Sequence, residues 1–294
     1  MKNFVITCSS TCDLTPYFLR NHNIYYVSFY YYLNGERYYD NFFDKHEINE
    51  FYNLLKTCES KTSQPDPLQY KELWSKLISQ GNDILHIELS SGLSGAYNSA
   101  RIARDMVLDE YKDSKIYVVD SLSASTGYGF LLDLISKYKE KNNNIDKVYE
   151  YTEKEKLNIN HIFIMSNFDQ LIKGGRISNL AGNIGKLMNI VPILHMNVDG
   201  KLEVVKKARG INNGIDEIVN MVKSNIIDGE NYNELFFMNK SPESDNYIKL
   251  YNKIKESFVN ASLEEENIFN IGTVIGSHIG SGCFAVYYHG NGRA

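Results

Sequence analysis

Alternation between strand-like and helix-like segments is the feature that most constrains how the first half of the chain can fold. Apolar runs at 4–10, 83–89 and 115–119 each lead into a polar turn and then into a segment whose apolar residues recur at helical spacing. Repeated strand–helix units predict a parallel sheet with crossover helices, and such sheets bind ligands at the carboxyl ends of their strands. We therefore expect an α/β fold whose site lies in the loops that follow these strands.

Two dipeptides mark turns of a different kind. Asn34-Gly35 lies between strand-like runs at 24–33 and 36–40, and Asp199-Gly200 separates two later runs. Such pairs between strand-like runs are the strongest short-range signal for a β-hairpin. The polar segment 58–65 has no strand-like pattern and is expected to form a loop.

The second half of the chain mixes paired strands with helices, which is typical of an α+β arrangement. Strands are expected at 161–166 and 233–238, a helix at about 244–260, and a last pair of strands joined by the glycine-rich segment 276–282.

The chain has 294 residues, which at roughly 150 residues per domain is enough for about two domains. We place the boundary near 157, which predicts a parallel α/β domain at 1–157 and an α+β domain with hairpins at 158–294.

The net charge of −5 at pH 7 argues against a nucleic-acid-binding protein, because such proteins carry basic patches that neutralise phosphates. No run of about 18 apolar residues could span a membrane, and the first residues lack the apolar core of a signal peptide. We therefore expect a cytoplasmic protein without stable membrane insertion. Its four cysteines are then expected to be reduced, and the spacing of Cys8 and Cys12 is by itself weak support for a metal site or a disulfide.

Tyrosine is unusually abundant, with 22 tyrosines against one tryptophan. An AT-rich coding sequence explains the total, and an aromatic binding surface is the alternative. The two interpretations differ in whether Tyr26, Phe29 and Tyr31 around the first hairpin point inward or toward solvent.

Three hydroxyl-rich loops at expected strand ends are candidate binding loops: Ser9-Ser10-Thr11, Thr62-Ser63 and the segment from Ser90 to Gly95. Ser94 lies where a helix is expected to begin, and a helix N-terminus favours a carboxylate or phosphate oxygen. Simple helix capping by Ser94 is the alternative.

The segment 92–96 also reads G-x-S-x-A between a strand and a helix, which is close to the nucleophile elbow of serine hydrolases. Asp120 and His278 follow Ser94 in the order that a catalytic triad would need. That order arises easily by chance, and no HGGG-type oxyanion segment precedes the serine. A serine acyl hydrolase using Ser94 is therefore kept as the alternative function.

Three further side chains could contact an anion. Arg176 follows two glycines. The chain has only seven arginines, so Arg176 and Arg209 carry more weight than an ordinary lysine would. The planar guanidinium group of arginine suits a carboxylate or a phosphate. A surface ion pair is the alternative for each. His278 stands among glycines in the segment 276–282 and is a candidate hydrogen-bond donor, whereas the other six histidines are expected to be structural.

Sequence signatures of common cofactors are absent. The chain contains no G-x-x-x-x-G-K-[ST], no G-x-G-x-x-G and no H-E-x-x-H pattern. We therefore expect no nucleotide, flavin or metal cofactor.

Together these segments resemble the DegV family of bacterial fatty-acid-binding proteins. The resemblance runs along nearly the whole chain and rests on several motifs in the expected order. They are S-S-T-C-D-L (9–14), T-S-Q-P (62–65), S-S-G-L-S-G-A-Y-N-S-A (90–100), V-D-S (119–121), G-G-R-I (174–177), D-G-K-L (199–202), Arg209 and I-G-S-H-I-G-S-G (275–282).

The resemblance implies a long-chain fatty acid held between the two domains, with its acyl chain in a buried tunnel. Its carboxylate would meet Thr62, Ser63 and Ser94, with the Gly95 backbone as support and His278 near by. The acid itself would be the only ligand, and the carrier would contain no catalytic residue.

In the better-understood branch of the family, the bound acid is presented to a separate ATP-dependent fatty acid kinase that makes an acyl phosphate. The resemblance therefore implies that Arg176, Arg209 and His278 lie near the carboxylate or at a kinase docking face. The family fold is also related to dihydroxyacetone kinase, which suggests a phosphotransferase as a third hypothesis. The substrate-bonding histidine of that enzyme has no convincing match here.

The sequence departs from the family pattern in four places. Ser9 replaces an aspartate of the opening motif, Ala96 replaces a threonine, and Ser281 stands where proline is usual. The segment 239–241, Asn-Lys-Ser, replaces the usual H-x-D. These changes are compatible with carboxylate binding through Thr62 and Ser94, and they bear mainly on the kinase partnership.

Overall fold

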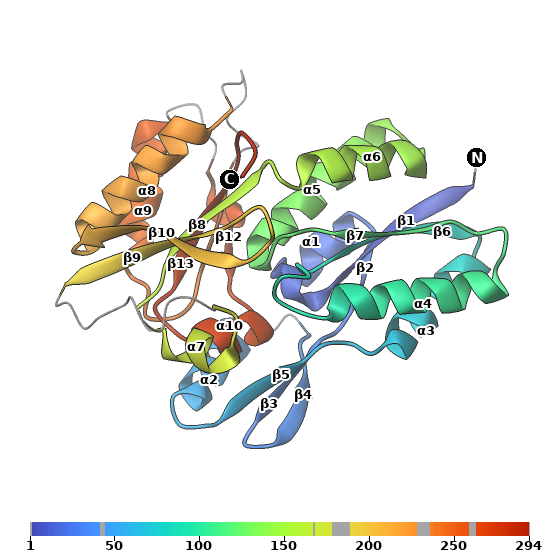
Figure 1. Cartoon of the computed structure of the whole chain (residues 1–294), viewed down its shortest axis with the longest axis horizontal. Helices are drawn as coiled ribbons and strands as arrows, with labels where there is room; N and C mark the ends of the chain where they lie inside the picture. The colour runs from blue at the N-terminus through green and yellow to red at the C-terminus, as the bar shows by residue number, and fades with distance from the viewer. Residues whose placement is uncertain are drawn as a thin grey trace.

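The computed structural model describes residues 2–41, 45–166, 168–177, 189–227, 236–258 and 263–293 (Figure 1). The helices in these residues are α1 (Pro16–Asn21), α2 (Lys45–Leu55), α3 (Pro67–Ser79), α4 (Ala96–Glu110), α5 (Ser125–Lys141), α6 (Ile145–Glu155), α7 (Asp169–Gly174), α8 (Ile211–Asn225), α9 (Tyr247–Ser257) and α10 (Thr273–Ile279). The strands are β1 (Asn3–Ser9), β2 (Ile24–Val27), β3 (Tyr30–Leu33), β4 (Glu36–Tyr39), β5 (Ser60–Ser63), β6 (Asn82–Glu88), β7 (Ile116–Asp120), β8 (Ile159–Ile164), β9 (Ile190–Met196), β10 (Leu202–Arg209), β11 (Phe236–Lys240), β12 (Ile268–Asn270) and β13 (Phe284–His289).

The first half of the chain forms the expected parallel sheet, with strand order β2-β1-β6-β7. Strands β1 and β6 are buried on both faces, as their continuous apolar runs require. Helices α3 and α4 cover one face, and α5 and α6 cover the other (Figure 1). Helix α3 begins with Asp66 as its N-cap, followed by Pro67, and Gln69 completes a capping box. The α/β prediction is therefore confirmed.

The second half forms a mixed sheet with strand order β10-β9-β8-β13-β11-β12. Its strands are antiparallel to their neighbours except for the parallel pair of β11 and β12. The predicted hairpin at Asp199-Gly200 joins β9 to β10. Alternation along β8 sends Ile162 and Ile164 toward a core under α8 and α9, and His161 and Phe163 to the opposite face. Residues 233–235 of the predicted late strand lie outside the described residues.

A third sheet, β4-β3-β5, corrects two predictions. The run 24–33 is two strands, because β2 joins the parallel sheet and β3 turns away into the small sheet. Segment 58–65 contains strand β5, in which Thr62 is paired with Tyr31 of β3. Strand β5 lies at the edge of this sheet and consists of polar residues, so its sequence lacks the apolar alternation that marks most strands.

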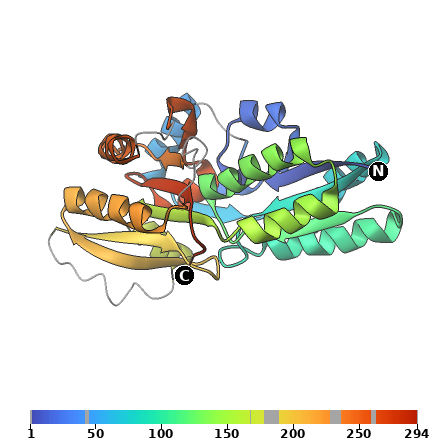
Figure 2. The same ribbon diagram turned by 90° about the horizontal axis from the view of Figure 1, so that it is seen from above.

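The three sheets meet around α5 and α10 (Figures 1 and 2). Helix α5 shares one continuous core with the parallel sheet and with Phe237 and Tyr287 of the mixed sheet. Val274 of α10 packs in another core with Phe29 and Phe51 from the first part of the chain. The chain passes from the parallel sheet to the mixed sheet between β7 and β8. We therefore propose that the domain boundary lies near residue 157. No helix in the described residues is both long and apolar enough to cross a membrane.

Candidate functional site

A cavity of about 300 Å³ lies where the three sheets meet, at the small end of the roughly 300–1,000 Å³ range of ligand pockets. Most of its wall is apolar. The apolar lining consists of Phe29, Leu89, Leu93, Ala124, Phe163, Leu171, Met196, Leu202, Ile271, Val274, Ile275, Ile279, Cys283 and Ala285. The polar lining side chains fall into two groups, one around Thr62 and His278 and one around His161 and Asn239.

The first polar group, which we call the mouth, is built on a contact between β5 and α10. Thr62 Oγ1 lies 2.7 Å from His278 Nε2. His278 lies in the last turn of α10. The prediction that it sits in a connection between strands was therefore wrong. The glycines that suggested a loop have packing roles here: a Cβ on Gly276 would lie 2.5 Å from the Tyr52 hydroxyl, and Gly280, with φ +69°, ends the helix.

The imidazole of His278 is neutral at pH 7. Removal from water lowers its pKa to about 4, and the positive charge of Arg176 acts in the same direction. A neutral ring has one donor and one acceptor nitrogen. His278 can thus hold the Thr62 hydroxyl in place without carrying a charge itself.

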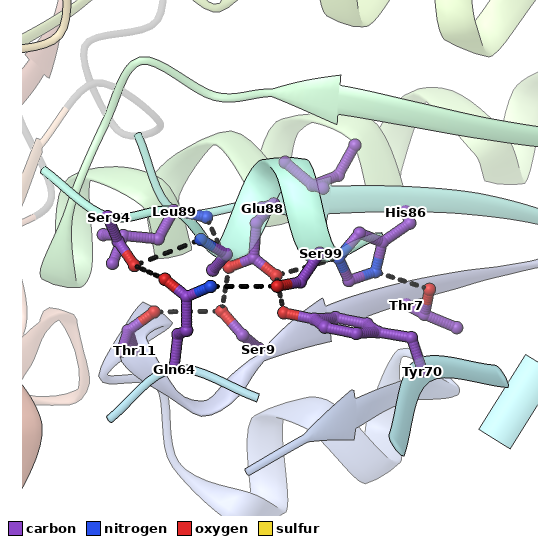
Figure 3. A network of polar contacts seen from close by, with 12 residues as sticks. Thr7, Ser9, Thr11, Gln64, Tyr70, His86, Glu88, Leu89, Ser94 and Ser99 are labelled. Atoms are coloured by element: carbon purple, nitrogen blue, oxygen red, sulfur yellow. Dashed lines mark hydrogen bonds and ion pairs between the residues drawn. The ribbon is translucent and has the colours of Figure 1, made fainter. Parts of the chain in front are cut away.

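Ser94 and Gln64 also line the mouth, and their side chains contact each other (Figure 3). Ser94 Oγ lies 3.3 Å from Gln64 Oε1 and accepts the Ala96 N–H at 3.2 Å, while Gln64 Nε2 donates to Ser99 Oγ at 2.9 Å. Gly95 is the N-cap of α4 and has no capping side chain. A Cβ on Gly95 would lie 2.8 Å from Gln64 Oε1, so glycine permits this close packing. Sequence reasoning missed Gln64, although it lies within the T-S-Q-P motif.

Arg176 and Ser63 also line the mouth. The Arg176 guanidinium donates to the Leu93 carbonyl at 3.3 Å and to the Gly174 carbonyl, which links the segment after α7 to the loop before α4. Ser63 Oγ donates to the Gln64 carbonyl at 3.3 Å. The structure thus brings Thr62, Ser63, Ser94, Gly95, Arg176 and His278 together. Arg209 is exposed at the end of β10 and is not among the described lining residues.

A buried network holds the end of β6, the strand that leads into the loop of Ser94 (Figure 3). The Glu88 carboxylate accepts from Ser9 Oγ and Tyr70 OH, both at 2.6 Å, and from the Leu89 N–H at 2.7 Å. His86 Nε2 is 3.1 Å from the same carboxylate. Ser9, which stands where the family has an aspartate, therefore supplies a donor to Glu88 where an aspartate would add a like charge.

The residues of the hydrolase hypothesis are engaged elsewhere. His278 Nε2 contacts Thr62, Asp120 Oδ1 accepts the backbone N–H groups of Ser91 and Leu122, and Ser94 contacts Gln64. This geometry does not support a Ser94–His278–Asp120 triad. Within the described residues, no cluster of three or more His, Cys, Asp or Glu side chains is arranged to hold a metal ion.

The hairpin aromatics answer the question raised by the tyrosine content. Tyr26 is 37% exposed, Tyr31 is buried against Tyr38 and Phe51, and Phe29 reaches the cavity wall. Of the described residues that line the cavity, one is a tyrosine, Tyr287. The abundance of tyrosine is therefore not explained by an aromatic cavity.

The fold and the site together define a three-sheet α/β protein with an apolar cavity and a polar mouth. The model of the DegV family, described as uncharacterised proteins, matches residues 3–290. A DegV domain-containing protein of Clostridium perfringens is 33% identical over 293 residues, which is 99% of each chain. The chain therefore belongs to the DegV family.

Two solved structures from Thermotoga maritima are similar over almost their full length. One, described as a DegV lipid-binding protein, has 27% identity and a TM-score of 0.82, and covers 100% of both chains. The other, described as revealing a fatty-acid-binding function, has 26% identity and a TM-score of 0.81 and covers 99% of this chain and 100% of that one.

Proposed function

We propose that this protein is a non-enzymatic carrier that binds a long-chain fatty acid in the cavity, with the carboxylate at the mouth. The observation that carries the proposal is the shape of the site, an apolar cavity whose mouth joins the Thr62 and Ser94 hydroxyls to the Arg176 cation. The functions described for the two Thermotoga maritima proteins support the same ligand class.

The apolar wall can supply most of the affinity. A chain of about 15 methylenes gains on the order of 12 kcal/mol at ~0.8 kcal/mol each when it leaves water. Association costs at least about 4 kcal/mol against that gain. The polar mouth therefore needs only to orient the acid, and hydroxyl donors with one arginine are sufficient for a carboxylate.

Arg176 is exposed and Ser94 partly exposed, whereas His161 and Asn239 are buried, so a carboxylate at the mouth would lie at the end of the cavity nearer to solvent. That position suits transfer to another protein. We propose that the bound acid is presented there to a separate ATP-dependent fatty acid kinase in the cytoplasm. Arg209 is exposed and away from the cavity lining, so in this proposal it contributes to docking rather than to ligand binding.

The test of fatty acid binding is a calorimetric titration of delipidated protein with hexadecanoate. We expect one acid per chain, and weaker binding by the double variant Thr62→Ala, Ser94→Ala. The matched ligand control is hexadecan-1-ol, whose affinity the double variant should change less. Lack of hexadecanoate binding would refute the proposal, and an unchanged affinity in the double variant would remove these hydroxyls from the mouth.

The test of presentation is acyl phosphate formation by a fatty acid kinase supplied with ATP and the loaded protein. We expect Arg209→Glu to reduce acyl phosphate formation while hexadecanoate affinity stays unchanged. Equal rates with and without the loaded protein would refute the partnership.

A further inference from the structure

The second polar group of the cavity contains two buried atoms without hydrogen-bond partners. His161 Nδ1 and Asn239 Oδ1 have none among the residues that the structure describes. The two side chains are 4% and 1% exposed, and both residues line the cavity. Buried polar atoms in native proteins are normally paired. Two unpaired atoms on residues that line one cavity therefore indicate that a ligand or a bound water pairs with them there.

These atoms lie away from the mouth. His161 is directly opposite Tyr287 in the β8–β13 ladder. Cys283 packs with Leu171 and Ile279 beside α7 and α10, on the side that carries the mouth. Tyr287 lies four residues further along the chain from Cys283, which is about 13 Å at roughly 3.3 Å per residue. Asn239 is opposite Ala285 in the neighbouring β11–β13 ladder, about 7 Å along the strand from Cys283, and its side chain reaches the Tyr287 hydroxyl at 2.7 Å. An acid with its carboxylate at the mouth would therefore bring its chain past Asn239 and its distal part to His161.

Neighbouring contacts hold the Asn239 side chain in one orientation. Its Nδ2 lies 2.8 Å from Ser125 Oγ, 3.2 Å from Thr126 Oγ1 and 2.7 Å from the Tyr287 hydroxyl. All three neighbours can accept hydrogen bonds, so the amide nitrogen is directed toward them. The carbonyl oxygen is thereby left as a fixed acceptor.

The His161 ring is held in the same way. Its Nε2 lies 3.0 Å from Ser123 Oγ, and its ring meets Tyr287 edge to face with centroids 5.3 Å apart. A Cβ on Gly127 would lie 2.1 Å from Nε2, so glycine at this position makes room for the ring. Burial lowers the pKa of His161 well below its usual value, so the ring is neutral. When the Ser123 hydroxyl donates to Nε2, Nδ1 carries the proton and is a donor.

We propose that the inner end of the cavity is a second polar subsite that binds a hydroxyl group on the distal half of the acyl chain, so that hydroxylated long-chain fatty acids are preferred ligands. A hydroxyl both donates and accepts. It can donate to Asn239 Oδ1 and accept from His161 Nδ1–H, whereas a saturated chain leaves both atoms unpaired. This inference rests on the proposed binding of a fatty acid with its carboxylate at the mouth.

The test compares octadecanoate with its isomers that carry a hydroxyl on the tenth, twelfth or last carbon, in competition against a fluorescent fatty acid. We expect at least one isomer to bind the wild-type protein about tenfold more tightly than octadecanoate. The advantage should shrink severalfold in Asn239→Leu and His161→Phe, which replace the orphaned atoms by apolar groups. Asn213→Leu, on the exposed part of α8, is the matched control and should keep the advantage.

A measurement without a core substitution protects the test against misfolding of these variants. In the wild-type protein, the preferred isomer should shift the ¹⁵N resonance of His161 Nδ1, and octadecanoate should not. Isomers that bind no better than octadecanoate, or a resonance that does not respond, would overturn the subsite, as would an ordered water that already fills it. Failure of fatty acid binding itself would be seen separately, because octadecanoate would then not bind at all.

Discussion

Thr62 and His278 are 216 residues apart in the chain, yet Oγ1 of the first lies 2.7 Å from Nε2 of the second. This contact joins the edge strand β5 to the last turn of α10 and closes one side of the cavity mouth. Because the pKa of His278 is lowered to about 4, the contact is a neutral hydrogen bond at pH 7.

Replacement of Thr62 by valine keeps the side-chain shape and removes the hydroxyl. We expect about tenfold weaker hexadecanoate binding, because a lost hydrogen bond to a charged group costs roughly 1.5 kcal/mol or more. Calorimetry measures the change, with Thr57→Val in the exposed turn after α2 as the control. Equal affinities of Thr62→Val and the wild type would show that this hydroxyl does not contact the carboxylate.

The two neighbouring glycines of the segment 174–175 should respond differently to alanine. A Cβ on Gly174 would lie 2.7 Å from His278 Nδ1, so Gly174→Ala should displace the ring and weaken ligand binding severalfold. Gly175 has φ +68° and open space around it, so Gly175→Ala should cost about 1 kcal/mol of unfolding free energy and leave affinity unchanged. Urea denaturation and calorimetry separate the two effects. The reverse pattern would contradict the placement of His278.

The two arginines singled out by the sequence should also differ. Arg176→Met should weaken hexadecanoate binding and remove most of its dependence on salt, because Arg176 is the cation at the mouth. Arg209→Met should do neither. Titrations at low and high salt measure both constants, and a larger effect at Arg209 would place the carboxylate elsewhere.

The contribution of His278 to the free energy of unfolding should fall as the pH is lowered from about 6.5 to about 4. The unfolded His278 takes up a proton in this range and the folded one does not, so the unfolded state binds more protons and is favoured. The loss at pH 5 should be about 2 kcal/mol from this residue. His161, whose pKa is also lowered by burial, acts in the same direction.

His278→Gln is the matched variant for this pH effect, because it keeps a hydrogen-bonding side chain without a titrating ring. Its free energy of unfolding should change less between pH 7 and pH 5 than that of the wild type. A parallel pH dependence of the two proteins would show that His278 is not responsible.

Sequence patterns predicted the parallel sheet because both faces of β1 and β6 are buried, which gives continuous apolar runs. Hydroxyl-rich loops made Thr62 and Ser94 candidates, with capping as the alternative for Ser94, and only the family resemblance implied that both meet a carboxylate. The structure places both side chains in the cavity lining. Sequence patterns failed for β5 and α10, since a polar edge strand and a short helix that contains Gly276 and lies between Gly272 and Gly280 both resemble loops in sequence. Gln64 and the pair of His161 and Asn239 could not be predicted, because their roles depend on contacts between distant segments.

Binding of a fatty acid in the cavity can be measured by native mass spectrometry of the protein as purified from bacteria, followed by chromatography of the extracted lipid. We expect a complex with one long-chain fatty acid per chain, released on denaturation. Protein that carries no lipid, and that takes up none when hexadecanoate is added, would contradict fatty acid binding.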